Sequence, residues 1–368
     1  MRRSLAAAAM AVAVFTLGAT HGATSHGARA QGEKFVFGVI PQTHLVGTDY
    51  RAMAEGGVRS LRVAVYWPRV EQEPQVIDWS GYDALVGRAA RRGVSVLPYL
   101  YGSPRWAATS DGIECTSDCS AYAPQSAETR GRFAFFASEA VRQYGPGGRF
   151  WAANPDVPYR PITTWQVWNE QNSSKYFAPQ PDAGSYAALL QRTAEAIRSV
   201  DPQAEILLGG MWGPDSTDGV VPTSTYLDQL YALPGARESF DSVGLHPYSS
   251  GLRGMLGQIR SARRAIRRAG DTEVGLWITE LGWASDGPSD HHLVKGRRGQ
   301  AKILGEAYSA LLERRERWGL RGAYWYAWKD VEPTDGFICL WCPGAGLRSV
   351  DDNGKPAWRK LKRLAHAG

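Results

Sequence analysis

The chain has 368 residues, of which 43% are hydrophobic and 21% are charged, and its formal net charge is +6. This length fits one large domain, and the charge is too small to indicate a nucleic-acid-binding protein. Beyond the N-terminal segment, no apolar run in the sequence is long enough to cross a membrane.

Residues 1–30 have the pattern of a secretory signal peptide. Arg2 and Arg3 precede an uncharged apolar core from Leu5 to Leu17, and Ala28-Arg29-Ala30 places small residues at both positions of an A-x-A cleavage site. The alternative is an uncleaved membrane anchor, for which this core is short. We therefore expect an extracellular mature chain of residues 31–368, with 39 basic and 36 acidic side chains.

The first half of the chain contains four apolar runs with the β-branched and aromatic composition of buried strands. These runs are Phe35 to Ile40, Val58 to Tyr66, Val94 to Leu100 and the start of Thr163 to Asn172. Helical patterns follow the second and third runs, around Tyr82 to Ala89 and Phe133 to Tyr144, and Gly145-Pro146 is expected to end the latter.

The second half continues the alternation with four more runs, Ala204 to Met211, Phe240 to Tyr248, Val274 to Trp283 and Gly322 to Trp328. A helix with Ser185 as N-cap is expected before them. Further helices are expected at Arg253 to Arg268, with its arginines on a solvated face, from about Arg298 to Trp318, and around Trp358 to Leu364.

Eight buried strands alternating with helices predict a parallel sheet covered on both faces, and a closed (β/α)8 barrel in a single domain. The alternative, an open doubly wound sheet, is expected to have a Gly-rich phosphate loop after its first strand. Gly38-Val39-Ile40-Pro41 is not such a loop. In a barrel, the reactive groups lie where the strands end.

Four cysteines form two close pairs, Cys115 with Cys119 and Cys339 with Cys342. In an exported chain, disulfides are favoured over a four-thiolate zinc site. Local pairing is favoured because each pair lies in its own Gly/Pro/Ser-rich loop, although three connectivities are formally open. We expect the cysteines to tie down loops and to take no part in chemistry.

The strand ends gather two carboxylates with aromatic and hydrogen-bonding side chains. Glu170 and Glu280 each follow a buried run, and such a pair is what glycoside hydrolysis requires. Aromatic side chains beside them suit the C–H faces of sugars.

No cluster has metal-ligand spacing, and we expect no cofactor. His291 and His292 are assigned to a solvated loop. The other candidates are His44, Arg62 or Trp67, Tyr99 or Tyr101, Asn169, Trp212, His246, Tyr248, Trp283 and Trp328.

Trp168-Asn169-Glu170 and Thr279-Glu280, together with His246-Pro247-Tyr248 and Trp328, resemble clan A glycoside hydrolases. The resemblance extends over roughly Phe35 to Trp328. Within the clan, the loop after Glu170 is similar to the family 39 and family 5 types, with Gln171 where proline is common. The resemblance to the clan implies a retaining (β/α)8 enzyme, with the proton donor after strand 4 and the nucleophile after strand 7.

The resemblance implies that Glu170 is the acid/base and that Glu280 is the nucleophile, with their carboxyl groups about 5–5.5 Å apart. Arg62 and Tyr248 would hold Glu280, and Asn169 would bind the sugar 2-hydroxyl. His246 and Trp328 would line the same subsite, to which we add His44 and Trp283 as substrate contacts. Simpler roles are an ion pair for Arg62, a barrel-filling role for His246, and core packing for Trp67, Trp212 and Trp283.

The predicted function is a secreted retaining β-glycoside hydrolase that acts on a poly- or oligosaccharide. A barrel that binds glycans without hydrolysing them is the alternative, although the presence of both carboxylates argues against it. An esterase lacks its Gly-x-Ser-x-Gly nucleophile elbow in this sequence, and no HExxH zinc-protease motif is present.

Overall fold

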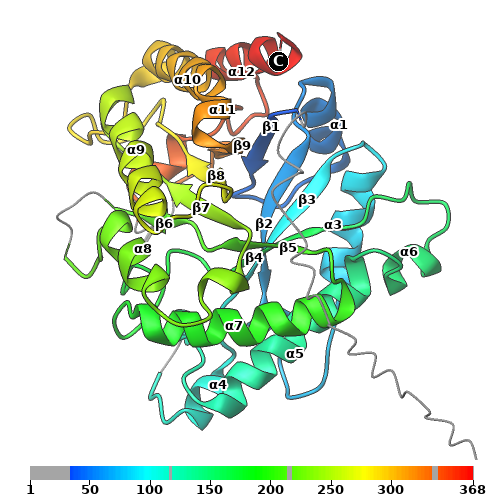
Figure 1. Cartoon of the computed structure of the whole chain (residues 1–368). Coiled ribbons are helices and arrows are strands. Elements are labelled where there is room, and N and C mark those ends of the chain that lie inside the picture. Colours follow the sequence, from blue (N-terminus) through cyan, green and yellow to red (C-terminus); the bar gives the residue numbers. More distant parts are fainter. Residues whose placement is uncertain (1–33, 116–117, 214–217, 334–338, 368) are drawn as a thin grey trace, which may run out of the picture.

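The structure, a computed structural model, describes residues 34–115, 118–213, 218–333 and 339–367. The predicted signal peptide lies outside this part of the chain. The strands of the described part all run parallel and lie at the centre of the molecule, inside a ring of helices (Figure 1). They are β1 Val36–Ile40, β2 Ser60–Tyr66, β3 Ser95–Tyr101, β4 Thr164–Val167, β5 Glu205–Leu208, β6 Met211–Trp212, β7 Ser242–His246, β8 Gly275–Leu281 and β9 Leu320–Tyr326.

The strands close into a barrel, as the sequence predicts. Strand β1 pairs with both β2 and β9, and the remaining pairings run on from these two until β5 meets β7 at Leu207 and Ser242. The fifth predicted run is divided at Gly209-Gly210 into β5 and the short β6, which share one position in the barrel. The eight predicted runs therefore occupy the eight positions of a closed (β/α)8 barrel.

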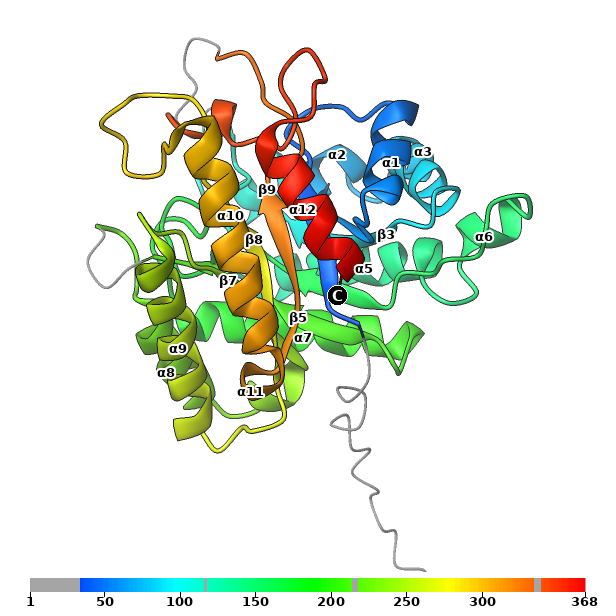
Figure 2. The same ribbon diagram turned by 90° about the horizontal axis from the view of Figure 1, so that it is seen from above.

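Helices cover the outside of the barrel (Figure 2), and α10 and α12 lie side by side there. The α-helices are α1 Gly47–Glu55, α2 Trp67–Val70, α3 Ser80–Ala90, α4 Arg105–Ser110, α5 Ala127–Tyr144, α6 Arg149–Ala153, α7 Ala183–Val200, α8 Thr223–Tyr231, α9 Leu252–Arg268, α10 Gly296–Glu313, α11 Arg315–Trp318 and α12 Pro356–Ala367. None of them has an apolar stretch long enough to cross a bilayer.

Three details of the helices differ from the expectations. The N-cap of α7 is Asp182, whose carboxylate accepts the Ser185 N–H at 2.6 Å, so Ser185 lies inside the first turn. The helix expected from about Arg298 to Trp318 is interrupted at Arg314, between α10 and α11. On α9, Arg263 is buried and donates to the carbonyls of Val274 and Trp318, while most of the other arginines are exposed. Burial lowers the pKa of Arg263 to about 10.

Two apolar clusters stabilise the fold. The larger one lies between the strands and the helices, where one face of each strand packs against an apolar helix face. The smaller one fills the barrel itself and consists of Ile40, Leu97, Leu207, Trp277 and Tyr324. Bulky side chains therefore fill the barrel below its C-terminal end. Two of them also hydrogen-bond polar groups of the strands, since Tyr324 donates to Ser60 and Trp277 donates to Glu205.

Both disulfides are local. Cys115 is joined to Cys119, and Cys339 is joined to Cys342, with Cα atoms 5.6 Å and 5.4 Å apart. These separations lie within the usual range for a disulfide. The favoured connectivity is confirmed.

Candidate active site

The two predicted carboxylates lie in one pocket at the C-terminal ends of the strands. Glu170 follows β4, Glu280 belongs to β8, and the pocket that both of them line has a volume of about 560 Å³. Parallel strands point their C-terminal ends to the same rim, so residues 110 positions apart in sequence meet there. The pocket includes Asn169 and Tyr248 as well, as the sequence predicts.

Arg62, on β2, joins two of these residues to Gln166 of β4. Its side chain is fully buried, and its nitrogen atoms donate to Gln166, Glu280 and Asn169, each at 2.7 Å. The guanidinium also lies over the ring of Tyr99, 4.1 Å from its centroid. A planar group with five donors satisfies several acceptors at fixed angles, which a lysine does not. Arg62 therefore fixes the relative positions of Glu280 and Asn169.

The orientation of the Asn169 amide follows from this contact. Arg62 has only donors, so the atom of Asn169 that faces it is the carbonyl oxygen. The Nδ2 group of Asn169 then remains as a donor on the pocket side of the residue. Asn169 is nearly buried, at 6% exposure, so its amide has little freedom to turn.

The backbone that carries Asn169 and Glu170 is strained. Trp168 has a φ of 70° and Glu170 a φ of 46°, values that non-glycine residues seldom adopt. Neighbouring strands hold this turn, because the N–H of Trp168 bonds the Leu100 carbonyl at 2.9 Å and the N–H of Glu170 bonds the Gly210 carbonyl at 3.0 Å. Strain that persists only because its surroundings impose it is typical of functional sites.

Glu170 shares a short contact with His246. Its Oε1 lies 2.7 Å from Nδ1 of His246, and both side chains are buried. Burial, followed by the negative charge of Glu280, raises the pKa of Glu170 well above its usual value. Burial and the charge of Arg62 lower the pKa of His246, so its ring is neutral. The Oε2 of Glu170 has no hydrogen-bond partner in the described part of the chain.

Glu280 is held in a different way. Its Oε1 accepts from Arg62 at 2.7 Å, and its Oε2 accepts the hydroxyl proton of Tyr248 at 2.8 Å. A cation and a hydroxyl donor thus each bond one oxygen of this carboxylate. The two glutamates of the pocket therefore differ: one is paired with a cation, and the other is buried beside a neutral ring.

Gly210, between β5 and β6, leaves room for His246. A Cβ atom on Gly210 would lie 1.9 Å from Nε2 of His246 and 2.6 Å from Oγ1 of Thr279. Both of these polar atoms are buried and lack a hydrogen-bond partner among the described residues. Only glycine fits here, because any side chain would displace the ring that contacts Glu170.

Glu170, His246 and Glu280 also form the one described group whose spacing would suit a metal ion. One potential ligand atom of each lies within 4.8 Å of the others. The sequence spacing does not reveal this cluster, because its members come from different strands. The site opposes a cation, however: Arg62 already bonds Oε1 of Glu280, and its charge would repel a metal ion.

Aromatic side chains form the walls of the pocket. Tyr176, Trp212, Tyr326 and Trp341 line it, together with Tyr99. Trp341 lies between the two cysteines of the second disulfide, and its ring packs against Tyr248 at 5.2 Å and Tyr326 at 5.6 Å between centroids. Cys339 and Cys342 line the pocket as well. This disulfide, expected only to tie down a loop, thus helps to form the site.

Three predicted substrate contacts are not among the residues that line the pocket. His44 is exposed and contributes nothing to the lining. Trp283 is buried, donates to the Ser249 carbonyl and packs against Trp325. Trp328 is fully buried, donates to Asp49 and packs edge-on against Trp358 of α12. The β9 residue that lines the pocket is Tyr326, the last residue of that strand.

Several lining residues were not predicted. Lys175, Tyr176 and Trp341 lie in loops whose course cannot be read from periodicity, and His291 and His292, assigned to a solvated loop, line the pocket. Gln166 alternates with Trp165 and Val167 on β4, so its inward position was available from the strand pattern.

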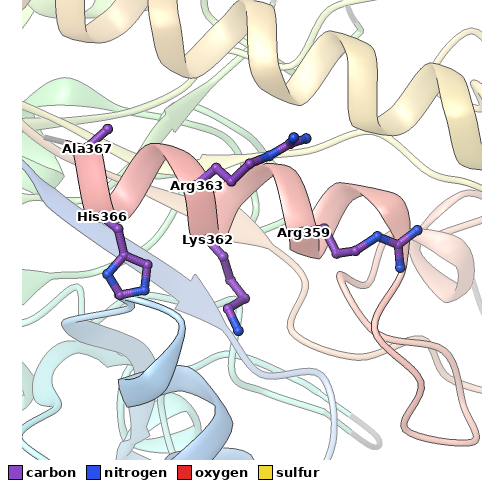
Figure 3. A pocket seen from close by; sticks show the side chains of 5 residues that line it. All are labelled: Arg359, Lys362, Arg363, His366 and Ala367. Atoms are coloured by element: carbon purple, nitrogen blue, oxygen red, sulfur yellow. The ribbon is translucent and has the colours of Figure 1, made fainter.

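A second hollow, of about 650 Å³, lies on the outer surface along α12 (Figure 3). It is lined by Arg359, Lys362, Arg363, His366 and Ala367. It contains no carboxylate and no residue from a strand end. The paired glutamates therefore identify the smaller pocket as the candidate active site.

No protein-family profile matches the chain, and no match to a curated protein is found. Solved structures of glycoside hydrolases do match. One is a family 39 glycoside hydrolase from Bacteroides cellulosilyticus WH2, with 19% identity, a TM-score of 0.63, and coverage of 89% of this chain and 63% of that chain. The GH39 enzyme from Xanthomonas axonopodis pv. citri has 20% identity, a TM-score of 0.65, and coverage of 91% and 66%.

Native xylanase 10B from Thermotoga maritima also matches, with 14% identity, a TM-score of 0.60, and coverage of 93% of this chain and 97% of that chain. This chain thus spans less than two thirds of the length of the two family 39 structures and nearly all of the xylanase. At such identities the similarity shows the fold. It confirms that the chain has a (β/α)8 fold like that of these glycoside hydrolases, as expected.

Proposed function

We propose that the protein is a secreted retaining β-glycoside hydrolase, with Glu170 as acid/base and Glu280 as nucleophile. The observation that carries this proposal is the pair of glutamates in one pocket, with a carboxylate oxygen of each within 4.8 Å of the other. Double displacement uses carboxyl groups about 5–5.5 Å apart, whereas inverting enzymes need about 6.5–9.5 Å to admit a water. The short spacing favours retention.

The contacts of the two glutamates support these roles. Glu170 has a raised pKa and no cation bonded to it, so it can keep a proton for the leaving-group oxygen. The Nδ1–H tautomer of His246 donates to Oε1 of Glu170 and leaves the acid proton on Oε2 free to transfer. Glu280, bonded by Arg62 and Tyr248, is available as an anion to attack the anomeric carbon.

In the second step, Glu170 acts as the base. Once the leaving group has departed with the proton of Glu170, this residue is an anion. It can then take a proton from a water molecule as the water attacks the anomeric carbon of the glycosyl-enzyme. The ester bond to Glu280 breaks, and Glu170 is protonated again. Burial raises its pKa in both steps, which suits a residue that must both give and take a proton near neutral pH.

The walls of the pocket supply substrate contacts. The Nδ2 group of Asn169 is left over by the Arg62 contact, and it is the donor we assign to the sugar 2-hydroxyl. Trp212, Tyr326 and Trp341 present aromatic surfaces that fit the apolar faces of a poly- or oligosaccharide. Secretion is supported by the N-terminal sequence and by the two disulfides.

A glycan-binding barrel without hydrolysis is the alternative function. It requires the same aromatic walls, but it gives no reason for the strained turn that positions Glu170 or for the buried Arg62 that holds Glu280. Hydrolysis is therefore the proposed activity.

Trapping of the glycosyl-enzyme tests the proposal. The protein is incubated with a panel of 2-deoxy-2-fluoroglycosides carrying good leaving groups, and the labelled peptide is mapped by mass spectrometry. We expect one adduct, on Glu280, and no adduct at this peptide in Glu280→Gln. An adduct on another residue, or an inverted product detected by NMR, would overturn the assignment.

The acid role is tested separately with Glu170→Gln. Loss of the acid should lower kcat by about 10²–10⁴-fold for substrates with poor leaving groups. Substrates with a dinitrophenolate leaving group need no proton, so their glycosylation should be far less affected. Equal losses for both substrate types would remove Glu170 from the acid role.

A further inference from the structure

The charges around the candidate active site are unevenly distributed. Among the described residues that line it, Glu170 and Glu280 are the only acids, whereas Lys175 supplies a cation and His291 and His292 supply imidazole N–H groups. Burial lowers the pKa of His291, so this ring acts as a hydrogen-bond donor and not as a charge. The two glutamates take part in the proposed chemistry. The basic groups have no role in it.

Lys175 is not neutralised by the protein. Its side chain is exposed, its ammonium lies 5.4 Å from the ring centroid of Tyr176, and no carboxylate of the described chain forms an ion pair with it. A cation beside an aromatic wall in a pocket is well placed to meet an anionic group of a ligand. By contrast, the exposed Arg268 on α9 is paired with Asp228 at 2.7 Å.

The two histidines come from another segment of the chain. They follow β8, which carries Glu280, and their rings stack with centroids 4.8 Å apart. The N–H of Leu293 donates to Nδ1 of His291 at 3.2 Å, and the N–H of Ala284 donates to the Leu293 carbonyl at 2.9 Å. These bonds attach the histidine segment to the end of β8. No carboxylate of the described residues lies within ion-pair distance of either ring.

Lys175 comes five residues after Glu170, so basic groups follow both of the strands that carry the glutamates. The glutamates themselves offer little repulsion to an anion. Arg62 is bonded to Glu280, and Glu170 holds a proton because burial raises its pKa. The centre of the pocket therefore does not repel an anionic substrate strongly, and Lys175 at its edge attracts one.

We propose that the substrate is an anionic glycan, whose carboxylate or sulfate group is bound by Lys175 and by the N–H groups of His291 and His292. This inference rests on the proposed hydrolase function and narrows its substrate class. The negative charge can come from a uronic acid or from a sulfate ester. Both present anionic oxygens to the same donors, and the experiment below tells them apart.

The test compares substrates that differ only in charge. Initial rates are measured for aryl β-glucosides, β-glucuronides and 6-sulfated β-glucosides, with the matching xylosides, galactosides and galacturonides, at low and high salt. We expect an anionic member to have the highest kcat/KM in its set and to lose this advantage at high salt. The preferred anion, carboxylate or sulfate, identifies the source. A neutral sugar that is hydrolysed best, with no salt dependence, would overturn the inference and leave the hydrolase proposal intact.

Variants of Lys175, His291 and His292 test whether these residues cause the preference for anionic substrates. In Lys175→Met, the anionic-to-neutral ratio of kcat/KM should fall by about fivefold, the value of one exposed charge contact. The ratio cancels any change in Glu170, because both substrates use the same acid. His291→Asn/His292→Asn should lower the ratio as well. Lys302→Met is the matched control, since Lys302 is an exposed lysine of α10 outside the pocket. An unchanged ratio in Lys175→Met would contradict the assignment.

Binding distinguishes the two proposals if no substrate is hydrolysed. In Glu170→Gln, the side chain has the size and zero charge of a protonated glutamate but cannot donate a proton to the leaving group. The variant therefore preserves the pocket while abolishing acid catalysis. Calorimetric titration with uronic-acid, sulfated and neutral oligosaccharides should show tighter binding of an anionic one. Such binding without hydrolysis would support the substrate class and reject the hydrolase. Equal or absent binding of all three would reject the inference.

Discussion

Arg62 makes the environments of Glu170 and Glu280 unlike. It bonds Glu280 directly, whereas Glu170 is buried next to a neutral His246 and has a raised pKa. Two carboxylates in one pocket take different roles only if their surroundings separate their protonation states. Burial and the charge of Glu280 raise the pKa of Glu170, whereas the arginine on β2 bonds Glu280 directly.

The raised pKa of Glu170 predicts how stability depends on pH. The folded protein binds this proton more tightly than the unfolded chain, so the contribution is fully present below the unfolded pKa, about 4.3. It is lost as pH rises through the higher folded pKa, where a buried negative charge appears. Glu170→Gln stays neutral throughout. We expect it to gain about 0.5–2 kcal/mol of unfolding free energy over the wild type at pH 8 and little at pH 4.

Urea unfolding between pH 4 and pH 8 measures this difference. Glu73→Gln is the control, because Glu73 is exposed and lies outside the pocket. The control should follow the wild-type curve across the whole range. If Glu170→Gln also runs parallel to the wild type, the proton on Glu170 is not held more tightly in the folded state.

At the scale of single residues, the sequence identified those side chains that end a strand. Glu280 lies on β8, while Asn169, Glu170 and Tyr248 follow β4 and β7 by two or three residues, and all four line the pocket. Trp328 likewise comes two residues after its strand, β9, but its side chain is buried and donates to Asp49, because the alternation of side chains does not continue beyond the end of a strand.

At the scale of elements, the loops closed by the two disulfides differ in their position relative to the pocket. Both loops are closed by cysteines a few positions apart, but only Cys339 and Cys342 line the pocket. Trp341 sits inside the second loop and packs against Tyr248, which bonds Glu280. The second loop thus connects an aromatic wall to the proposed nucleophile.

Removal of the second disulfide should therefore weaken substrate binding. In Cys339→Ser/Cys342→Ser, we expect KM to rise about three- to tenfold, the value of one aromatic contact, because Trp341 loses its fixed position. The matched control is Cys115→Ser/Cys119→Ser, which removes a disulfide that does not line the pocket. Steady-state kinetics of both variants measures the difference. An equal rise in both would show a general loss of stability and no role for Trp341.

The elements themselves were largely predictable. All eight strand runs were found, since parallel strands covered on both faces are continuously apolar. Short helices such as α4 and α6 were not, because a helix of five or six residues has too few turns to show periodicity. The break between α10 and α11 has no clear signal in the helical pattern either.

At the scale of the whole molecule, the proposed secretory signal in residues 1–30 gives a prediction that is separate from the barrel. We expect the exported protein to begin at Gln31, after removal of residues 1–30. Intact-mass measurement of the protein from the medium of a secreting host checks this. Bulky residues in place of Ala28 and Ala30 should block cleavage. A secreted protein that retains residues 1–30 would contradict the predicted signal peptide.

The sequence alone determined the architecture and the pair of glutamates. Both are written in local patterns: apolar runs set the strands, helical patterns cover them, and the polar residue at a run's end lies on the barrel's rim. What surrounds those glutamates depended on tertiary structure. The contacts of Arg62, the cluster of Glu170 with His246, and the walls formed by Trp341 and Lys175 arise when closure of the barrel brings distant loops together. Loops carry no periodicity, so only the folded chain places their side chains.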